Sequence, residues 1–211
     1  MRNAWALAPI ALLTMALAGC GTPKPIMYYD LQIPAAPSPS TSRYPIDMVV
    51  GRITGPDLLG SSPIVYRTKQ NQIGTYQYHR WTEAPVDLIQ EKLIRLMRVS
   101  GEYRSVNGLR NAPGSELMVR GRLYDFAEVD GDGITGLVSM EFELYNRKTA
   151  RILWSHFYTG TEPVPRKEVA AVAQALDRSL DRGLKEVMDG LRQYFATAAA
   201  AESQVTEAKG K

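Results

Sequence analysis

Cys20 is the only cysteine among the 211 residues, so it is the one thiol available for covalent modification. It follows an apolar run of about fourteen residues, from Ala4 to Leu17, and the positive Arg2 precedes that run. A run of this length is typical of a signal peptide and is shorter than the roughly twenty residues of a membrane-spanning helix. The sequence therefore predicts a cleaved export signal over residues 1–19. The alternative is that Cys20 is an ordinary buried thiol.

The residues around this cysteine, Leu17-Ala18-Gly19-Cys20, resemble the lipobox of bacterial lipoproteins. The resemblance implies a diacylglyceryl thioether on Cys20 and an acylated amino terminus, with residues 20–26 as a lipidated tether. Several acyl chains on one residue hold a protein on a membrane almost permanently. Gly21 stands where inner-membrane lipoproteins of Gram-negative bacteria usually have Asp, which favours the outer membrane and a domain facing the periplasm. Apart from this covalent lipid we expect no cofactor.

The remaining reactive side chains form no recognisable catalytic or metal-binding pattern. Asp130 and Asp132 have the spacing of two calcium ligands, but the residues after them lack the other oxygens of an EF-hand, which favours a hairpin turn. The two histidines, His79 and His156, lie in predicted strands and in no zinc motif. The sequence also lacks a G-x-S-x-G elbow. We therefore predict neither an enzyme nor a metal site.

Residues 76–81, Tyr-Gln-Tyr-His-Arg-Trp, form the densest polar and aromatic cluster of the chain. Strand alternation would place the even-numbered residues on one face and the odd-numbered residues on the other. Aromatic residues and arginine dominate binding hot spots, so this cluster is a candidate partner interface. Its candidate residues are Tyr76, Tyr78, Arg80 and Trp81. The alternative interpretation is that Trp81 anchors the corner between strand and helix in the core.

Charge and length limit the class of protein. The 25 basic and 22 acidic residues are interspersed and give a net charge of only +3, which argues against nucleic-acid binding. Without residues 1–19 the chain is long enough for one domain with a sizeable core. We predict a single α+β domain over residues 27–198 and a disordered tail over 199–211.

Hydrophobic periodicity predicts the elements that position these residues. The sheet is expected to be mostly antiparallel, with a three-stranded meander at its C-terminal end. Two main helices are expected, and the longer one, near the C-terminus, is expected to pack across the sheet. The predicted strands are 28–33, 46–53, 64–66, 73–78, 116–129, 134–145 and 151–160, and the predicted helices are 84–98 and one that begins near Lys167 and ends near residue 198.

The order of these features resembles the ABC-type transport auxiliary lipoproteins, which include the Pqi-type outer-membrane lipoproteins. The matching features, in chain order, are the lipobox, Tyr28-Tyr29-Asp30-Leu31, the strands that end at Arg80-Trp81, the helix opened by Pro85, the sheet with Leu153-Trp154 and the long final helix. The resemblance implies a compact α+β lipoprotein without enzymatic activity. Its implied partners are an Mce-domain periplasmic protein and the inner-membrane subunits of an ABC transporter.

The sequence thus favours a non-catalytic, outer-membrane-anchored periplasmic subunit that tethers a lipid or solute transport system. The alternative is a lipoprotein that assists the assembly of an outer-membrane barrel or of a lipopolysaccharide export component. A homo-oligomer is compatible with either function.

Overall fold

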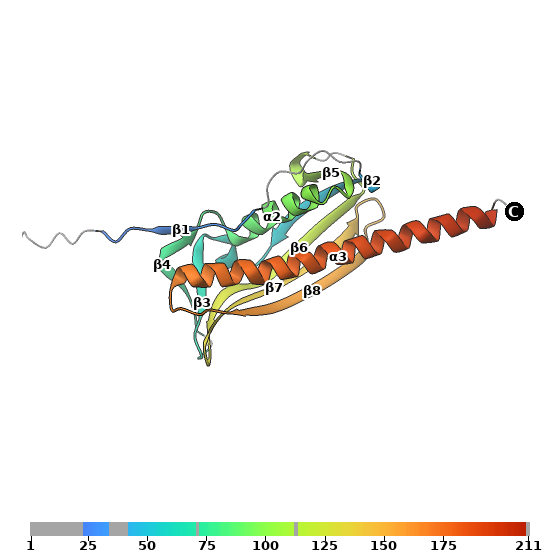
Figure 1. Ribbon diagram of the computed structural model, residues 1–211. Coiled ribbons are helices and arrows are strands. Elements are labelled where there is room, and N and C mark those ends of the chain that lie inside the picture. Colours follow the sequence, from blue (N-terminus) through green and yellow to red (C-terminus); the bar gives the residue numbers. More distant parts are fainter. Residues whose placement is uncertain (1–22, 34–41, 71, 112–113, 210–211) are drawn as a thin grey trace, which may run out of the picture.

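The computed structural model describes residues 23–33, 42–70, 72–111 and 114–209. The predicted signal over residues 1–19 and the predicted lipidation site at Cys20 lie outside these residues. Figure 1 shows a twisted sheet crossed by one long helix, with the first described residues at one end of the molecule. The elements are β1 (Met27–Tyr29), β2 (Tyr44–Thr54), η1 (Asp57–Gly60), β3 (Pro63–Arg67), β4 (Ile73–Trp81), α2 (Pro85–Val99), β5 (Tyr103–Gly108), η2 (Leu109–Asn111), β6 (Leu117–Asp130), β7 (Ile134–Asn146), β8 (Arg151–Pro163) and α3 (Val169–Lys209).

Strand β6 is the central strand of the sheet. One edge of β6 pairs antiparallel with β7 over its whole length, and β7 pairs antiparallel with β8. The other edge of β6 is shared: β2 pairs parallel with its first half and β3 pairs parallel with its second half. Strand β5 extends the sheet beyond β2, while β4 and then β1 extend it beyond β3.

The predicted α+β class and the mostly antiparallel sheet are confirmed, because the long pairings are the antiparallel ones. The predicted hairpin between β3 and β4 is also present. The four parallel pairings were not predicted, and neither was β5. They join segments that are far apart in the sequence, so no turn motif indicates them.

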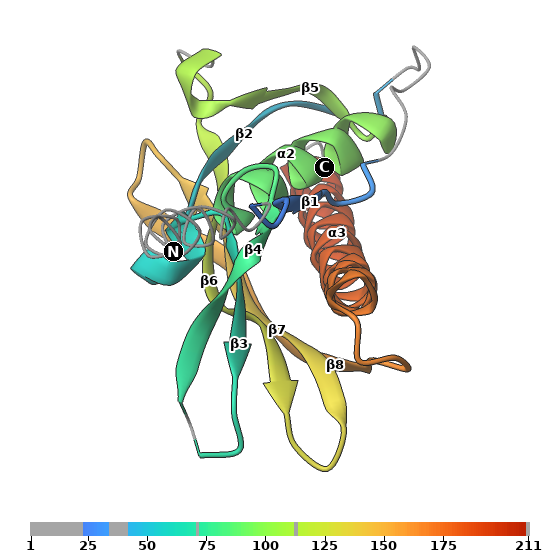
Figure 2. The same cartoon turned by 90° about the vertical axis from the view of Figure 1, so that its left-hand side faces the viewer.

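Both helices lie inside the curve of the sheet, as Figure 2 shows. Helix α2 begins at Pro85, as predicted, and Gly101 just beyond its end has a φ of 63°, which glycine adopts without strain. Helix α3 crosses β7 and β8. Its leucines at 176, 180, 184 and 191 are fully buried, which confirms the predicted packing of the long helix across the sheet.

Helix α3 approaches the sheet closely at Gly183. A Cβ atom there would lie 2.3 Å from Met140 Cε and 2.6 Å from the ring of Tyr158. Glycine is a poor helix former, and here it leaves room for these two side chains of the sheet.

The predicted tail over 199–211 is wrong for most of its length, because α3 continues to Lys209. Phe195 is the last core residue of this helix, and the helix then projects beyond the sheet (Figure 1). Alanines at 196 and 198–201 explain the extension, since alanine is the strongest helix former. No helix among the described residues is long and apolar enough to cross a membrane.

Candidate functional site

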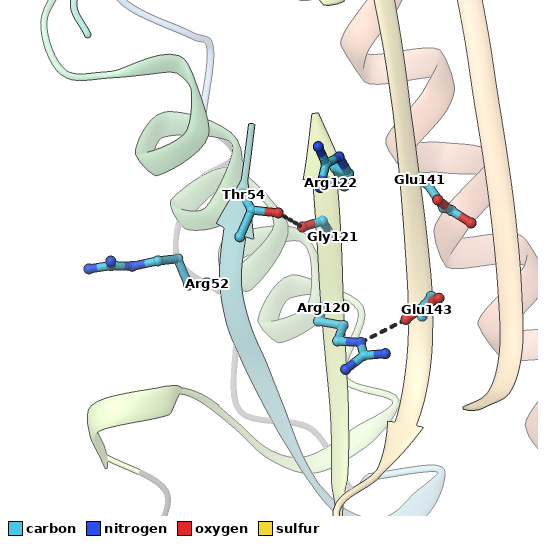
Figure 3. A pocket seen from close by; sticks show the side chains of 7 residues that line it. All are labelled: Arg52, Thr54, Arg120, Gly121, Arg122, Glu141 and Glu143. Atoms are coloured by element: carbon cyan, nitrogen blue, oxygen red, sulfur yellow. Dashed lines mark hydrogen bonds and ion pairs between the residues drawn. The ribbon is translucent and has the colours of Figure 1, made fainter. Parts of the chain in front are cut away.

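The outer face of the sheet, opposite the two helices, carries a polar pocket. Its cavity measures about 320 Å³, and its lining comes from β2, β6 and β7. Figure 3 shows these residues: Arg52, Thr54, Arg120, Gly121, Arg122, Glu141 and Glu143. Antiparallel register places Arg120 opposite Glu143 and Arg122 opposite Glu141. Successive outer positions of the two strands therefore supply the charged lining.

Arg120 is the best-held arginine of the pocket. Its Nε donates to Glu143 Oε2 at 2.7 Å, and its guanidinium lies 4.3 Å from the ring centre of Tyr145. Glu141 is held differently, because its Oε2 accepts a hydrogen bond of 2.8 Å from the Tyr124 hydroxyl. This bond, together with partial desolvation, raises the pKa of Tyr124.

Arg52 and Arg122 have no salt-bridge partner within the described part of the chain. Arg52 points away from the two glutamates (Figure 3). The hydroxyl of Thr54 donates to the Gly121 carbonyl, so the pocket presents no activated nucleophile beside a base. Guanidinium groups without a salt-bridge partner, at and beside an open pocket, suit the binding of an acidic group.

Two exposed rings continue this face beside the pocket. Tyr124 on β6 and Phe157 on β8 are 36% and 55% exposed, and their ring centres lie 5.9 Å apart. Phe157 is the register partner of Glu141. We refer to these two rings together with the pocket as the outer face.

The predicted cluster at 76–81 is arranged differently from the alternation prediction. Between β3 and β4 the register advances from Pro63 to Val65 on one strand but from Arg80 to Thr75 on the other, so β4 bulges. The bulge brings the rings of Tyr76 and His79 to 5.7 Å, although alternation placed them on opposite faces. The alternation prediction is therefore wrong within the bulge.

Tyr76 is half-buried in a polar aromatic group. Its hydroxyl donates to Glu128 Oε2 at 2.8 Å, and burial together with this carboxylate raises the pKa of Tyr76. His79 Nδ1 lies 2.8 Å from the Tyr29 hydroxyl, and the ring centre of Tyr66 is 5.2 Å from that of Tyr76. These contacts join β1, β3, β4 and β6.

Trp81 does not belong to an exposed interface. It is 1% exposed, and its ring centre is 5.3 Å from that of Phe126. Its backbone N–H donates to the Ser62 carbonyl at 2.7 Å. Trp81 therefore anchors the corner between strand and helix, as the alternative interpretation held. Tyr78 and Arg80 remain half-buried at the β1 edge, and their role as an interface stays a prediction.

A buried ion pair that the sequence analysis missed joins the two helices. Lys92 of α2 is 1% exposed, and its Nζ lies 2.5 Å from Asp177 Oδ1 and 2.6 Å from Asp181 Oδ1 on α3. Asp177 Oδ2 also accepts a bond of 3.2 Å from the backbone N–H of Gln32. The sequence does contain a sign of this ion pair, because Lys92 lies on the apolar stripe of its helix beside Ile89, where a charged side chain needs a buried partner.

The predicted turn at Asp130 and Asp132 is confirmed. Gly131 N–H donates to the Gly133 carbonyl at 3.0 Å, and Asp132 pairs loosely with Lys69 at 3.5 Å. Nowhere in residues 23–33, 42–70, 72–111 and 114–209 do three His, Cys, Asp or Glu side chains form a group that could hold a metal ion.

Solved structures share this fold. The crystal structure of protein XCC0632 from Xanthomonas campestris, of the DUF330 family, matches with a TM-score of 0.70 at 16% identity, covering 83% of this chain and 99% of that one. The crystal structure of an uncharacterized protein matches with a TM-score of 0.61 at 14% identity, covering 78% of this chain and 97% of that one. No curated protein matches. At these identities the likeness concerns the fold alone.

The sequence itself matches a family model over residues 29–188, which is most of the chain and includes β2 to β8, α2 and the first half of α3. The β4 corner at Trp81, α2 and the meander lie within this match in the expected order. The chain therefore belongs to the family of ABC-type transport auxiliary lipoprotein components.

Proposed function

We propose that this protein is a non-catalytic subunit of a lipid transport system, anchored in the outer membrane through a lipid on Cys20 and facing the periplasm. The family match over residues 29–188 carries the proposal, because it names a lipoprotein component of ABC-type transport. The lipobox-like Leu17-Ala18-Gly19-Cys20 supplies the anchor. Mce-domain and ABC-transporter subunits are the proposed partners.

A tether needs a second contact in addition to its lipid, and we assign the partner contact to the outer face. Both helices leave this face uncovered. It combines Arg52 and Arg122, which form no salt bridge with any residue that the structure describes, with the exposed rings of Tyr124 and Phe157. Such a surface fits a partner with acidic side chains and an apolar patch. Tyr78 and Arg80 lie instead at the β1 edge.

The anchor is tested by fractionating cells that make the wild-type protein or its variants. Cys20→Ala should lose the acyl mass and leave the outer-membrane fraction, because no thioether can form. Gly21→Asp is the matched control: it keeps the cysteine, stays acylated and should shift toward the inner membrane. An unacylated wild-type protein, or a Cys20→Ala protein that stays in the outer membrane, would contradict the lipid anchor.

The partner is tested by purifying the detergent-solubilised, tagged protein and identifying its companions by mass spectrometry. An Mce-domain protein with the ATPase and permease supports the proposal, whereas an outer-membrane barrel protein supports the assembly alternative. The double variant Arg52→Glu/Arg122→Glu should lose the companion while the domain remains folded. The pair Tyr78→Ala/Arg80→Ala is the control, and loss of binding only there would return the interface to the β1 edge.

A further inference from the structure

The segment that leads into β1 exposes three consecutive large apolar side chains. Ile26, Met27 and Tyr28 are 44%, 51% and 61% exposed. Neighbouring residues of a strand point to opposite faces, so a strand covered on one face would bury at least one of three neighbours. All three are exposed here because β1 is a three-residue edge strand that pairs only with β4 among the described strands.

The exposure ends abruptly along the chain. Tyr29 is half-buried, and Leu31 is 4% exposed and belongs to the core. The apolar patch formed by Ile26, Met27 and Tyr28 is therefore confined to the end of the described chain that lies nearest to Cys20. Figure 1 shows this end of the molecule opposite the projecting end of α3.

The charges beside the patch are suited to a membrane surface. Lys24 is the only charged residue from Pro23 to Tyr29, and its Nζ lies 5.1 Å from the ring centre of Tyr78. Arg80 lies opposite Tyr28 in the register of β1 and β4. Apolar and aromatic side chains with lysine or arginine at their margin are the pattern of segments that lie in the headgroup layer of a bilayer.

The length of the tether limits what can cover this patch. Ile26 is six positions after Cys20, and two of the five residues between them are the prolines Pro23 and Pro25. A proline-rich segment spans about 3.1 Å per residue, so Ile26 lies within about 20 Å of a lipidated Cys20. Such a short connection keeps the patch within about 20 Å of the membrane that holds the lipid.

We propose that Ile26, Met27 and Tyr28 enter the headgroup layer of the membrane that holds Cys20, as a second, non-covalent contact with lipid. The inference rests on the proposed lipid anchor and adds an orientation to it: β1 faces the membrane, and the far end of α3 points into the periplasm. A second copy of the chain on the same patch is the competing occupant.

The test places an environment-sensitive fluorophore on the acylated full-length protein in vesicles of phosphatidylethanolamine and phosphatidylglycerol. Once Cys20 is acylated, an introduced cysteine is the only free thiol, so Met27→Cys can be labelled selectively. Its emission should shift to shorter wavelength and be quenched by brominated lipid. Phe157→Cys, equally exposed but on the outer face, is the matched control and should remain in water.

The outcomes separate this inference from the anchor. Mass spectrometry reports acylation of Cys20, and its absence would remove the anchor and the inference together. An acylated protein whose label at residue 27 reports water would overturn the inference and leave the anchor intact. A shift that depends on protein concentration in detergent, without vesicles, would assign the patch to a second copy and also overturn it.

Discussion

The two faces of the sheet are built from alternate residues of the same strands, yet one face is apolar and buried and the other is charged and exposed. On the inner face of β7, Val138 and Phe142 are at most 1% exposed beneath α3. On the outer face of the same strand, Glu141 and Glu143 reach a polar pocket with two unpaired arginines beside it. Burial determines stability on the inner face, and the outer face offers accessible charge for the proposed partner contact. A substitution on each face should therefore have a different readout.

The largest effect is expected on the inner face, from Phe142→Ala. Removing a fully buried ring should lower the free energy of unfolding by about 3–5 kcal/mol, because the lost burial adds to the cost of the cavity. Urea denaturation followed by circular dichroism measures it. Phe157→Ala removes the same ring from the outer face and should cost less than about 1 kcal/mol. Equal losses would contradict the division between the faces.

The second prediction concerns Lys92, which is the most deeply buried charged residue in the part of the chain that the structure describes. Lys92→Met should destabilise the fold by about 3 kcal/mol, because it leaves the carboxylate of Asp177 buried without its partner. The double variant Lys92→Met/Asp177→Leu should recover much of this loss in urea denaturation. If the double variant is as unstable as the single one, the buried carboxylate is not the cause.

A smaller effect is expected on the outer face, from Arg120→Ala. The ion pair with Glu143 is 2.7 Å long, but the Arg120 side chain is 41% exposed, so water screens the attraction. The loss of stability should be at most about 1 kcal/mol and should shrink as salt concentration rises. Thermal unfolding at low and high salt measures it, and a large loss that salt does not change would show that Arg120 is a packing residue.

The smallest effect concerns the pH dependence at Asp47. Its hydrogen bonds from Arg104 and Ser105 lower the pKa of the carboxyl group from 3.8 to about 2. Because the folded pKa is the lower one, the bonds stabilise the fold above the unfolded pKa, and this contribution is lost as the pH falls toward 2. The melting temperature of Asp47→Asn should thus be slightly below that of the wild type at neutral pH, and the two should converge in acid. A constant difference would exclude titration of Asp47.

The local parts of the fold were predictable from the sequence. The β6–β7 turn carries Asp130-Gly131-Asp132-Gly133, and the strands on either side alternate, so the hairpin followed from neighbouring residues. The apolar residues that recur every three or four positions predicted the long helix α3 equally clearly. Strand β5 was missed because its buried residues, Tyr103 and Val106, are three apart and break the period of two.

The candidate site was less predictable because it depends on irregular or distant pairing. The bulge in β4 cannot be read from residues 76–81 alone, since the partner strand β3 imposes the register. The outer-face pocket unites β2 with β6 and β7 through a parallel pairing between strands far apart in the chain. Cys20 needed no tertiary information, because its motif is contiguous, and its lipidation stays a prediction.

The bond between Gln32 and the buried ion pair has a mechanical consequence for a tethered protein. With the proposed lipid on Cys20 and the proposed partner in place, a pull between the two would enter the fold at β1. Two connections would carry the load: the pairing of β1 with β4 leads to the sheet, and the backbone N–H of Gln32, bonded to Asp177, leads to Lys92 and both helices. The chain after β1 is thus connected to both the sheet and the helices, so we expect tension on the proposed tether to be shared between the two layers and not carried by β1 alone.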